Sequence, residues 1–344
     1  MKKLDYLGFP TQMTDESVIH IAKVVIPRRI KQETIWFDYV KSINGTENLN
    51  LKSKHFKKLV RAGIPDSERS HIWCKILGVF DKMNDNPGYY VNSLRNSSAI
   101  DPEIMEQIML DVPRTFDGAI SFSSGAVLNI LKVFALSCPE IGYCQSISFL
   151  AAIVLSVIHA EEPSFWALRL MIENYFPREY YAPSMFDFTV DLTLVKLLIS
   201  ERSPELNRAV KSLNYDWIQC ASGWLLTAFS NSFPIATVLR IWDSFLLEGP
   251  KIVFRVIVAF LRMNEHEIKS CDDQNLLPKL IKRLEVNTVD QDKLMSTAFS
   301  IKMFSREHLK ELREASKKSI VENGLGSQPK MKACLQSMFG QLNM

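Results

Sequence analysis

One arginine and one glutamine, each in a short segment, are the residues of this sequence best suited to chemistry. Arg114 follows a proline in IMLDVPRTF at 108–116, and Gln145 stands in GYCQSISF at 142–149. A guanidinium can stabilise charge that develops on phosphate oxygens, and a carboxamide can orient a water molecule by both donating and accepting hydrogen bonds. The two residue types therefore fit phosphoryl transfer without any further catalytic group.

Both residues also have an ordinary structural explanation. Asp111 stands three residues before Arg114, which is the spacing of a helical ion pair, and a surface pair of that kind contributes roughly 0 to 1 kcal/mol. Gln145 would be a polar residue at the start of the apolar run at 147–158. Taken alone, each residue favours the structural explanation, so a wider pattern is needed to favour chemistry.

Other kinds of site lack their motifs in this sequence. There is no G-x-x-x-x-G-K-[ST] and no G-x-G-x-x-G, so we expect no nucleotide affinity of the chain's own. H-E-x-x-H, G-x-S-x-G and a cysteine–histidine cluster are missing as well. His71 and Cys74 lie one helical turn apart, but two isolated ligands are expected to be packing residues. We therefore expect neither a metal site nor a cofactor.

The bulk composition is that of a globular protein. The 344 residues are 47% apolar and 23% charged, and the formal charge of +3 is too small to indicate nucleic-acid binding. Six scattered cysteines without a C-x-x-C pair indicate reduced thiols. The first residues show no secretory leader, and the longest apolar run, at 147–158, is too short to cross a bilayer. We expect a cytoplasmic protein without direct membrane insertion.

Residues typical of helix starts and ends recur along the chain, whereas strand patterns are nearly absent. In DPEIMEQIML, Asp101 is placed to cap a helix and Pro102 to occupy its first position. Similar starts or stops stand at prolines 113, 139, 163, 204, 234 and 250. The run at 147–158 fits a helix that is buried on all sides. We predict an all-α fold of a dozen or more helices.

Composition and helix signals divide the chain into three zones. Residues 1–30 are polar and are predicted to form an irregular lead-in. Residues 31–270 contain the strong signals for helix starts and ends. From 271 to 344 the charge density rises, which predicts C-terminal helices and a loosely ordered tail after Gly324. Within the middle zone, Arg240 and Asp243 have the spacing of an internal ion pair. Tryptophans 73, 166, 224 and 242 are expected to be core anchors.

Five ordered blocks between about residues 56 and 270 resemble the TBC domain, the family of GTPase-activating proteins for Rab GTPases. The blocks are RAGIPDSERSHIWCKILG at 61–78, I-x-x-D-x-x-R at Ile108, Asp111 and Arg114, Y-x-Q at Tyr143 and Gln145, WALRLMIENYFPREYY at 166–181, and RIWDSFLLEGPKIVFRVIVAFL at 240–261. Within the family, NPGYY at 86–90 and YYAPSM at 180–185 look most like the growth-hormone-regulated TBC proteins.

The resemblance implies a fold, a partner and a mechanism. Residues 31–270 would form the TBC domain, an all-α unit of two packed helical subdomains with a groove between them. Its partner would be a GTP-bound Rab GTPase at endomembranes, which carries the GTP and the magnesium ion. The chain would be an activator rather than an enzyme with a substrate of its own. Arg114 would be an arginine finger and Gln145 a glutamine finger.

The resemblance also implies supporting residues. Asp111 and Tyr143 would brace the two fingers, with Ile108 and Ser146 beside them in the same motifs. Ser146 departs from the usual pattern because a glycine commonly follows the glutamine, and Asp117 stands in place of the common proline. A serine hydroxyl that crowded the groove would change the rate and the Rab preference. The alternative is therefore a catalytically weak module that binds GTP-loaded Rab as an effector or scaffold.

Overall fold

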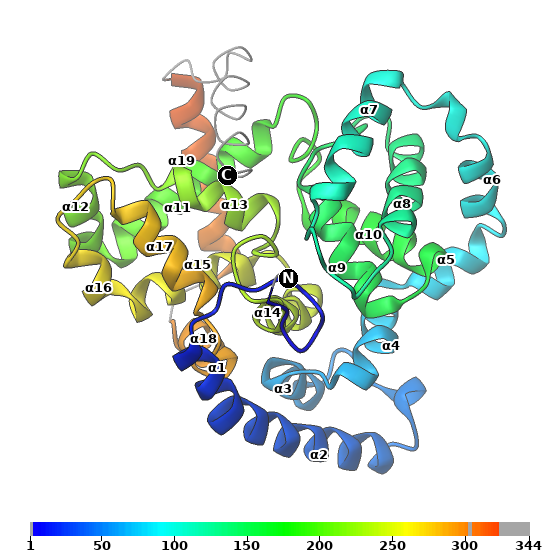
Figure 1. Ribbon diagram of the computed structural model, residues 1–344, viewed down its shortest axis with the longest axis horizontal. Coiled ribbons are helices and arrows are strands. Elements are labelled where there is room, and N and C mark those ends of the chain that lie inside the picture. The colour runs from blue at the N-terminus through cyan, green and yellow to red at the C-terminus, as the bar shows by residue number, and fades with distance from the viewer. Residues whose placement is uncertain (1–2, 302–304, 323–344) are drawn as a thin grey trace.

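The computed structural model describes residues 3–301 and 305–322, and its helices account for nearly all the regular structure there. The one β-type pairing in these ranges is an isolated bridge between Leu4 and Pro10. The all-α prediction is confirmed. In chain order the helices form two groups, and Figure 1 shows most of the first beside the second, with α14 between them and with α1 below the second group, next to α18.

The first group of helices runs up to α10. Its members are α1 (Asp15–His20), α2 (Ile26–Ser42), α3 (Lys54–Ala62), α4 (Asp66–Leu77), α5 (Val79–Asp85), α6 (Tyr89–Arg95), α7 (Pro102–Asp111), α8 (Ser124–Ser137), α9 (Ile147–Ile158) and α10 (Glu161–Tyr175). Short helical turns stand at Ile21–Val25, Thr46–Asn48, Ser97–Ala99 and Val112–Arg114.

The second group follows α10. It comprises α11 (Phe186–Arg202), α12 (Pro204–Ser212), α13 (Ile218–Leu226), α14 (Ile235–Glu248), α15 (Lys251–Met263), α16 (Glu265–Lys269), α17 (Leu277–Val286), α18 (Gln291–Ser300) and α19 (Arg306–Glu322). Helix α14 packs on α15 within this group and on α3 and α4 of the first group. One continuous hydrophobic core therefore runs through both groups.

Helix α9 is the rigid element on which one side of the site is built. It spans the predicted range, and ten of its twelve residues are buried, in contact with α4, α8 and α10. Helix α7 supports the other side. The Asp101 side chain accepts a hydrogen bond from the amide of Glu103 and caps α7, and Pro102 follows at its first position. A 3₁₀ turn at Val112–Arg114 then ends this helix.

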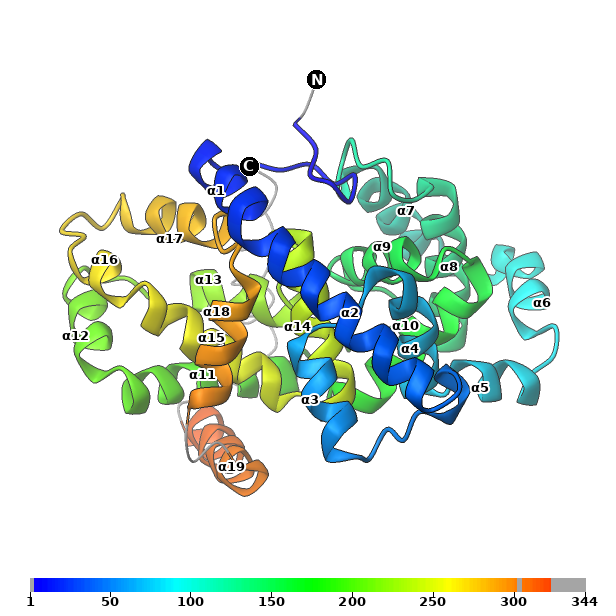
Figure 2. The same ribbon diagram turned by 90° about the horizontal axis from the view of Figure 1, so that it is seen from below.

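The prediction of an irregular lead-in at 1–30 is wrong from residue 15 onward. Thr14 caps α1, and a π-helical turn at Ile21–Val25 joins α1 to α2. Figure 2 shows α1 and α2 as one nearly continuous rod across this face of the molecule. A π turn holds more residues than an α turn, so it breaks the apolar spacing that would reveal one long helix. The domain limits at 31 and 270 remain predictions, and the tail after Gly324 lies outside the described residues.

The predicted pair of Arg240 with Asp243 is also wrong. Asp243 is fully buried and accepts hydrogen bonds from Nε of Arg69 (3.0 Å), Nε1 of Trp73 (2.9 Å) and the amide of Ile64 (3.0 Å). Arg240 instead donates to the carbonyl of Val60 (3.1 Å), and burial lowers its pKa to about 10. Donors distant in sequence thus satisfy Asp243 and fasten α4 to α14.

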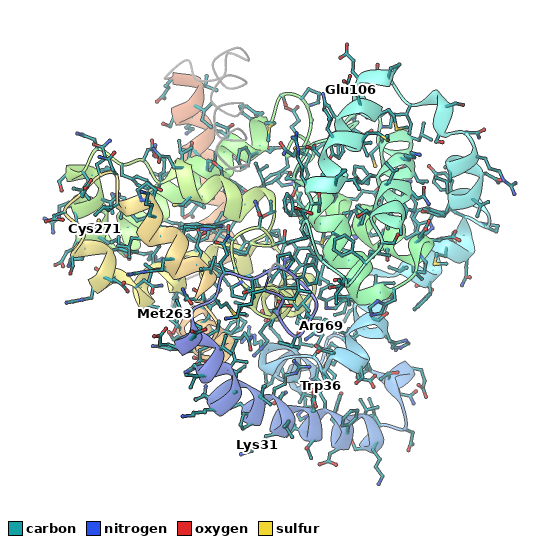
Figure 3. All side chains as sticks on the ribbon, viewed as in Figure 1. Lys31, Trp36, Arg69, Glu106, Met263 and Cys271 are labelled. Carbon is teal, nitrogen blue, oxygen red and sulfur yellow. The ribbon has the colours of Figure 1, made fainter. Side chains whose placement is uncertain are left out.

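The expected tryptophan anchors are confirmed, because all four side chains are at most 1% exposed. Trp36 is a further anchor that the sequence patterns did not single out, and its Nε1 donates to the carbonyl of Gly63. In Figure 3, Trp36 lies on the inner side of α2 and Lys31 on its outer side, while Arg69 lies at the centre of the molecule. The turn before α4 is therefore held by Trp36 from one side and by α14 from the other.

Candidate functional site

A cleft of about 1060 Å³ opens between the two groups of helices. One wall consists of residues 113–117 with Asp111, Gln145, Ser148 and Phe149. The facing wall consists of residues 230–235 with Lys282 and Val286, and a third side is formed by Lys3, Asp5 and residues 10–12. Arg114 and Gln145 thus line the same cleft, as expected of the groove that the resemblance implies.

Arg114 ends the 3₁₀ turn and is exposed to solvent. Among the described residues, its guanidinium makes no hydrogen bond and no direct ion pair, and its charge acts on Asp111 only through space. The Asp111 carboxylate is instead engaged by Tyr143, whose hydroxyl donates to Oδ2 at 3.1 Å. The charge of Arg114 is therefore available to a group that enters the cleft.

The contact between Asp111 and Tyr143 joins the two predicted finger segments. Burial raises the pKa of Asp111, and the hydrogen bond from Tyr143 and the charge of Arg114 offset only part of that rise. Burial, together with the neighbouring carboxylate, raises the pKa of Tyr143 well above its ordinary value. The Tyr143 hydroxyl therefore stays protonated and keeps donating near neutral pH.

Gln145 precedes α9 and is half-buried. Its backbone carbonyl accepts hydrogen bonds from the amide of Ser148 (3.3 Å) and from the Ser148 hydroxyl (2.9 Å). Its carboxamide has no hydrogen-bond partner within the described part of the chain. The backbone of Gln145 is thus fixed to the first turn of α9, while its side chain remains available to the cleft.

A second link between the segments runs through two hydroxyls. Thr115 follows Arg114, and its Oγ1 lies 2.8 Å from Oγ of Ser148 and 2.9 Å from the carbonyl of Asp111. Each hydroxyl has one proton to donate. Donation from Thr115 to Ser148 and from Ser148 to the carbonyl of Gln145 forms a continuous path between the two segments. Sequence reasoning missed both residues, because a lone threonine and a lone serine carry no motif.

The other two predicted supporting residues lie behind the cleft. Ile108 is fully buried in α7 and holds the helix that leads to Arg114. Ser146 is only 2% exposed, and its Oγ lies 3.4 Å from Sγ of Cys144. Ser146 does not line the cleft. The buried hydroxyl therefore gives no support to the hypothesis that Ser146 crowds the groove, and its effect on rate and Rab preference stays a prediction.

The facing wall is a turn that the surrounding residues hold in an unfavourable conformation. Ala228 and Phe229 have φ angles of 44° and 71°, and such values for residues other than glycine cost about 1 to 3 kcal/mol each. Nε1 of Trp242 donates to the carbonyl of Ala228 at 2.9 Å, and the Phe229 ring stacks on Phe233 at 5.0 Å. The turn that carries this wall is therefore held by a hydrogen bond from α14 and by ring stacking within the turn itself.

The described residues also bear on metal binding and on membrane insertion. Within residues 3–301 and 305–322, no three histidine, cysteine, aspartate or glutamate side chains are grouped so that they could bind a metal ion. None of the helices in the same ranges combines the length and apolar character needed to span a bilayer. Among the side chains that line the cleft, Arg114 and Gln145 offer a guanidinium and a carboxamide without hydrogen-bond partners in the described ranges, beside the charged groups of Lys3, Asp5, Asp111, Asp117 and Lys282.

Sequence comparisons match the chain to one kind of domain. Residues 66–269 match the model of the Rab-GTPase-TBC domain. The chain is 32% identical over 275 residues to TBC1 domain family member 2A of Mus musculus, a match that covers 78% of this chain and 30% of that protein. It is 32% identical over 234 residues to growth hormone-regulated TBC protein 1-A of Danio rerio, covering 66% of this chain and 64% of that protein. The chain thus spans less than two thirds of either relative.

Solved structures show the same fold at lower identity. The Chlamydomonas flagellar RabGAP TBC domain superposes with a TM-score of 0.76 at 24% identity, over 86% of this chain and 99% of that one. The Ypt/Rab-GAP domain of Gyp1p gives a TM-score of 0.64 at 18% identity, over 79% of this chain and 98% of that one. At these identities the likeness establishes the arrangement of the helices.

Proposed function

Because the chain belongs to the Rab-GTPase-TBC domain family, we propose that it is a GTPase-activating protein that accelerates GTP hydrolysis by a Rab GTPase. The Rab would bring the nucleotide and the magnesium ion, and this chain would supply the missing side chains in trans. It would reach endomembranes through its Rab partner.

Arg114 has the role of stabilising charge on the γ-phosphate oxygens, and Gln145 that of orienting the attacking water. The observation that carries this proposal is that the two side chains line one cleft, and that among the described residues neither has a hydrogen-bond partner. No internal ion pair has to break before the Arg114 guanidinium binds phosphate. Arginine fingers supplied in trans raise GTP hydrolysis by about 10³- to 10⁵-fold.

The geometry also supports preorganisation of the two segments that carry these side chains. The segments are cross-linked by the contact of Asp111 with Tyr143 and by that of Thr115 with Ser148. Donors and dipoles that are already in place lose little reorganisation energy during the reaction. The hydrogen bond between Tyr143 and Asp111 supports the bracing role that the resemblance implies for these two residues.

No residue near the cleft now favours the alternative of a binding module without catalysis. That alternative depended on Ser146, whose hydroxyl is buried against Cys144 and away from the cleft. We therefore propose a catalytically competent activator.

Single-turnover hydrolysis, measured on a panel of GTP-loaded Rabs with and without the purified chain, tests the proposal. We expect acceleration of at least one Rab, and none by the double variant Arg114→Ala, Gln145→Ala. Binding of a GTP-loaded Rab without acceleration would favour the scaffold instead. Nucleotide affinity of the isolated chain, measured by equilibrium binding of labelled GTP, should be undetectable, since the sequence has no phosphate-binding loop.

A further inference from the structure

The N-terminal turn, residues 3–11, lies directly against the segment that carries Arg114. The amide of Ile120 donates to the carbonyl of Gly8 at 2.9 Å, and the Ser121 hydroxyl donates to the carbonyl of Leu7. Gly8 has a φ of +81°, and a Cβ at this position would come within 2.8 Å of the Ile120 side chain. Figure 2 shows this turn looping beside the chain that follows α7 before it returns to α1.

The turn has an internal structure of its own. The amide of Asp5 donates to the carbonyl of Phe9 at 2.8 Å, and that of Thr11 donates to the carbonyl of Lys3 at 2.9 Å. The Asp5 carboxylate accepts from the amides of Leu7 and Phe9, both at 2.9 Å. These hydrogen bonds all lie within the turn, so they stabilise its shape independently of its contacts with the rest of the protein.

The turn is also anchored on α2, through Tyr6. Nη1 of Arg29 donates to the Tyr6 hydroxyl, and the guanidinium carbon of Arg29 lies 5.1 Å from the centre of the Tyr6 ring. The turn therefore bridges α2 and the Arg114 segment, two elements that are far apart in sequence.

Aromatic side chains connect the N-terminal turn with the segments of both predicted fingers. Phe9 is 1% exposed, and its ring meets that of Phe116 edge-on at 5.0 Å. The ring of Phe116 in turn meets that of Phe149 edge-on at 5.1 Å. Phe116 stands two residues after Arg114, and Phe149 lies in the first turn of α9, four residues after Gln145. One row of three rings thus connects the turn with both segments.

The backbone of Phe116 needs such support. Its φ is 49°, which lies in the left-handed region that bulky residues rarely adopt. Conformations of this kind persist only where surrounding residues hold them. Because Phe116 lies so close to Arg114, a change in its φ would redirect the guanidinium.

We propose that the N-terminal turn holds the Arg114 segment in its cleft-facing conformation, and that Phe9 is a positioning residue for the arginine finger. The inference rests on the proposed GTPase activation for its kinetic consequence. Phe9 touches no substrate in this scheme, and it acts through Phe116. A Rab that already docks on the cleft would still bind after Phe9 is truncated, but Arg114 would be displaced during hydrolysis.

Kinetics on the cognate Rab tests the consequence. Phe9→Ala should lower kcat by roughly 10- to 100-fold, the loss expected when a catalytic group shifts by about 1 Å, with KM within about 3-fold of the wild type. Phe9→Leu should restore most of kcat. Ser121→Ala, which removes one bond to the turn and leaves the core intact, should give a smaller loss in the same direction. Phe56→Ala is the matched control, because Phe56 is also fully buried but contacts Trp36 instead.

Amide hydrogen exchange tests the positioning without any GTPase. Phe9→Ala should raise exchange in residues 112–122 and leave α15 protected, whereas Phe56→Ala should leave 112–122 unchanged. Unchanged exchange there, a rise in KM alone, or an equal kcat loss in Phe56→Ala would overturn the proposal. If the wild type activated no Rab, the proposed function would fail, and the exchange experiment would still decide whether the turn holds this segment.

Discussion

Thr115 and Ser148 lie with their hydroxyl oxygens 2.8 Å apart, and both side chains are at most 4% exposed. One follows the predicted arginine finger, and the other stands three residues after the predicted glutamine finger. A buried hydroxyl pair resists separation, because either partner left alone would lose a hydrogen bond that water cannot replace. Together with the hydrogen bond from Tyr143 to Asp111, this pair therefore helps to set the distance between the two finger segments.

Thr115→Val should show whether the Thr115 hydroxyl contributes to stability alone or also to the rate of GTP hydrolysis. The change keeps the shape of the side chain and removes its hydroxyl, which should cost about 1 to 3 kcal/mol of stability and about tenfold in kcat for the cognate Rab. Thr237→Val is the matched control, since the hydroxyl of Thr237 is also buried and donates to the carbonyl of Thr288 at 2.7 Å. Denaturant unfolding and single-turnover kinetics measure the two quantities.

Equal kinetic losses in the two threonine variants would show that Thr115 acts on stability alone. A loss confined to Thr115→Val, at matched stability, would place the effect in the geometry of the fingers.

Helices were predictable from the sequence because their signals are local. Asp101, Pro102 and the apolar run at 147–158 act within a few residues, and the structure has α7 and α9 where those signals predict them. The π turn at Ile21–Val25 escaped prediction, because it interrupts the periodicity on which that reasoning depends.

Partners distant in sequence were not predictable in the same way. Asp243 is bonded to Arg69, which lies 174 positions earlier, and not to the neighbour one helical turn away. The inward turn of Ser146 likewise depends on how α9 packs, which no local pattern encodes. Arg114 and Gln145 were found through a family resemblance, whereas the residues that link their segments became visible only with the fold.

Glu248 should make the stability of the protein depend on acid pH. Burial alone would raise its pKa, but hydrogen bonds from Arg61 and Lys57 outweigh burial and lower it from 4.5 to about 2. Because the folded pKa is depressed, the stabilisation is present above the unfolded value of 4.5 and is lost as the pH falls towards 2. The shift corresponds to about 3 kcal/mol.

The variant Glu248→Gln checks this linkage. At pH 7 its free energy of unfolding should be lower than that of the wild type by on the order of 3 kcal/mol, and the difference should shrink steadily below pH 4.5. Denaturant titrations at several pH values give the comparison. A difference that stayed constant from pH 7 to pH 3 would mean that the ion pairs of α3 with Glu248 add no net stability.

Ser146→Gly should leave GTPase activation within about twofold of the wild type, because the hydroxyl that it removes is buried and does not line the cleft. The variant should lose only a few tenths of a kcal/mol of stability, as expected for glycine in place of serine at a helix start. A panel of GTP-loaded Rabs is the measurement. A broadened set of accepted Rabs would show that the serine does restrict the groove.

The identity of the cation at position 114 should matter as much as its charge. Arg114→Lys should lose nearly as much activation as Arg114→Ala, on the order of 10³-fold or more, because lysine lacks the planar fork that contacts two phosphate oxygens. Both variants should stay folded, since Arg114 is exposed and makes no hydrogen bond or ion pair among the described residues. Single-turnover hydrolysis and a melting curve for each variant give the result.

Arg95→Lys is the matched control for that experiment, because Arg95 is exposed on α6 and does not line the cleft. It should change neither activation nor melting temperature. A factor of 10³ in rate corresponds to about 4 kcal/mol of barrier, far more than the 0 to 1 kcal/mol, roughly, that a surface arginine contributes through an ion pair. If Arg114→Lys kept near-wild-type activation, a point charge would suffice, and Arg114 would act by attracting the Rab rather than by contacting its transition state.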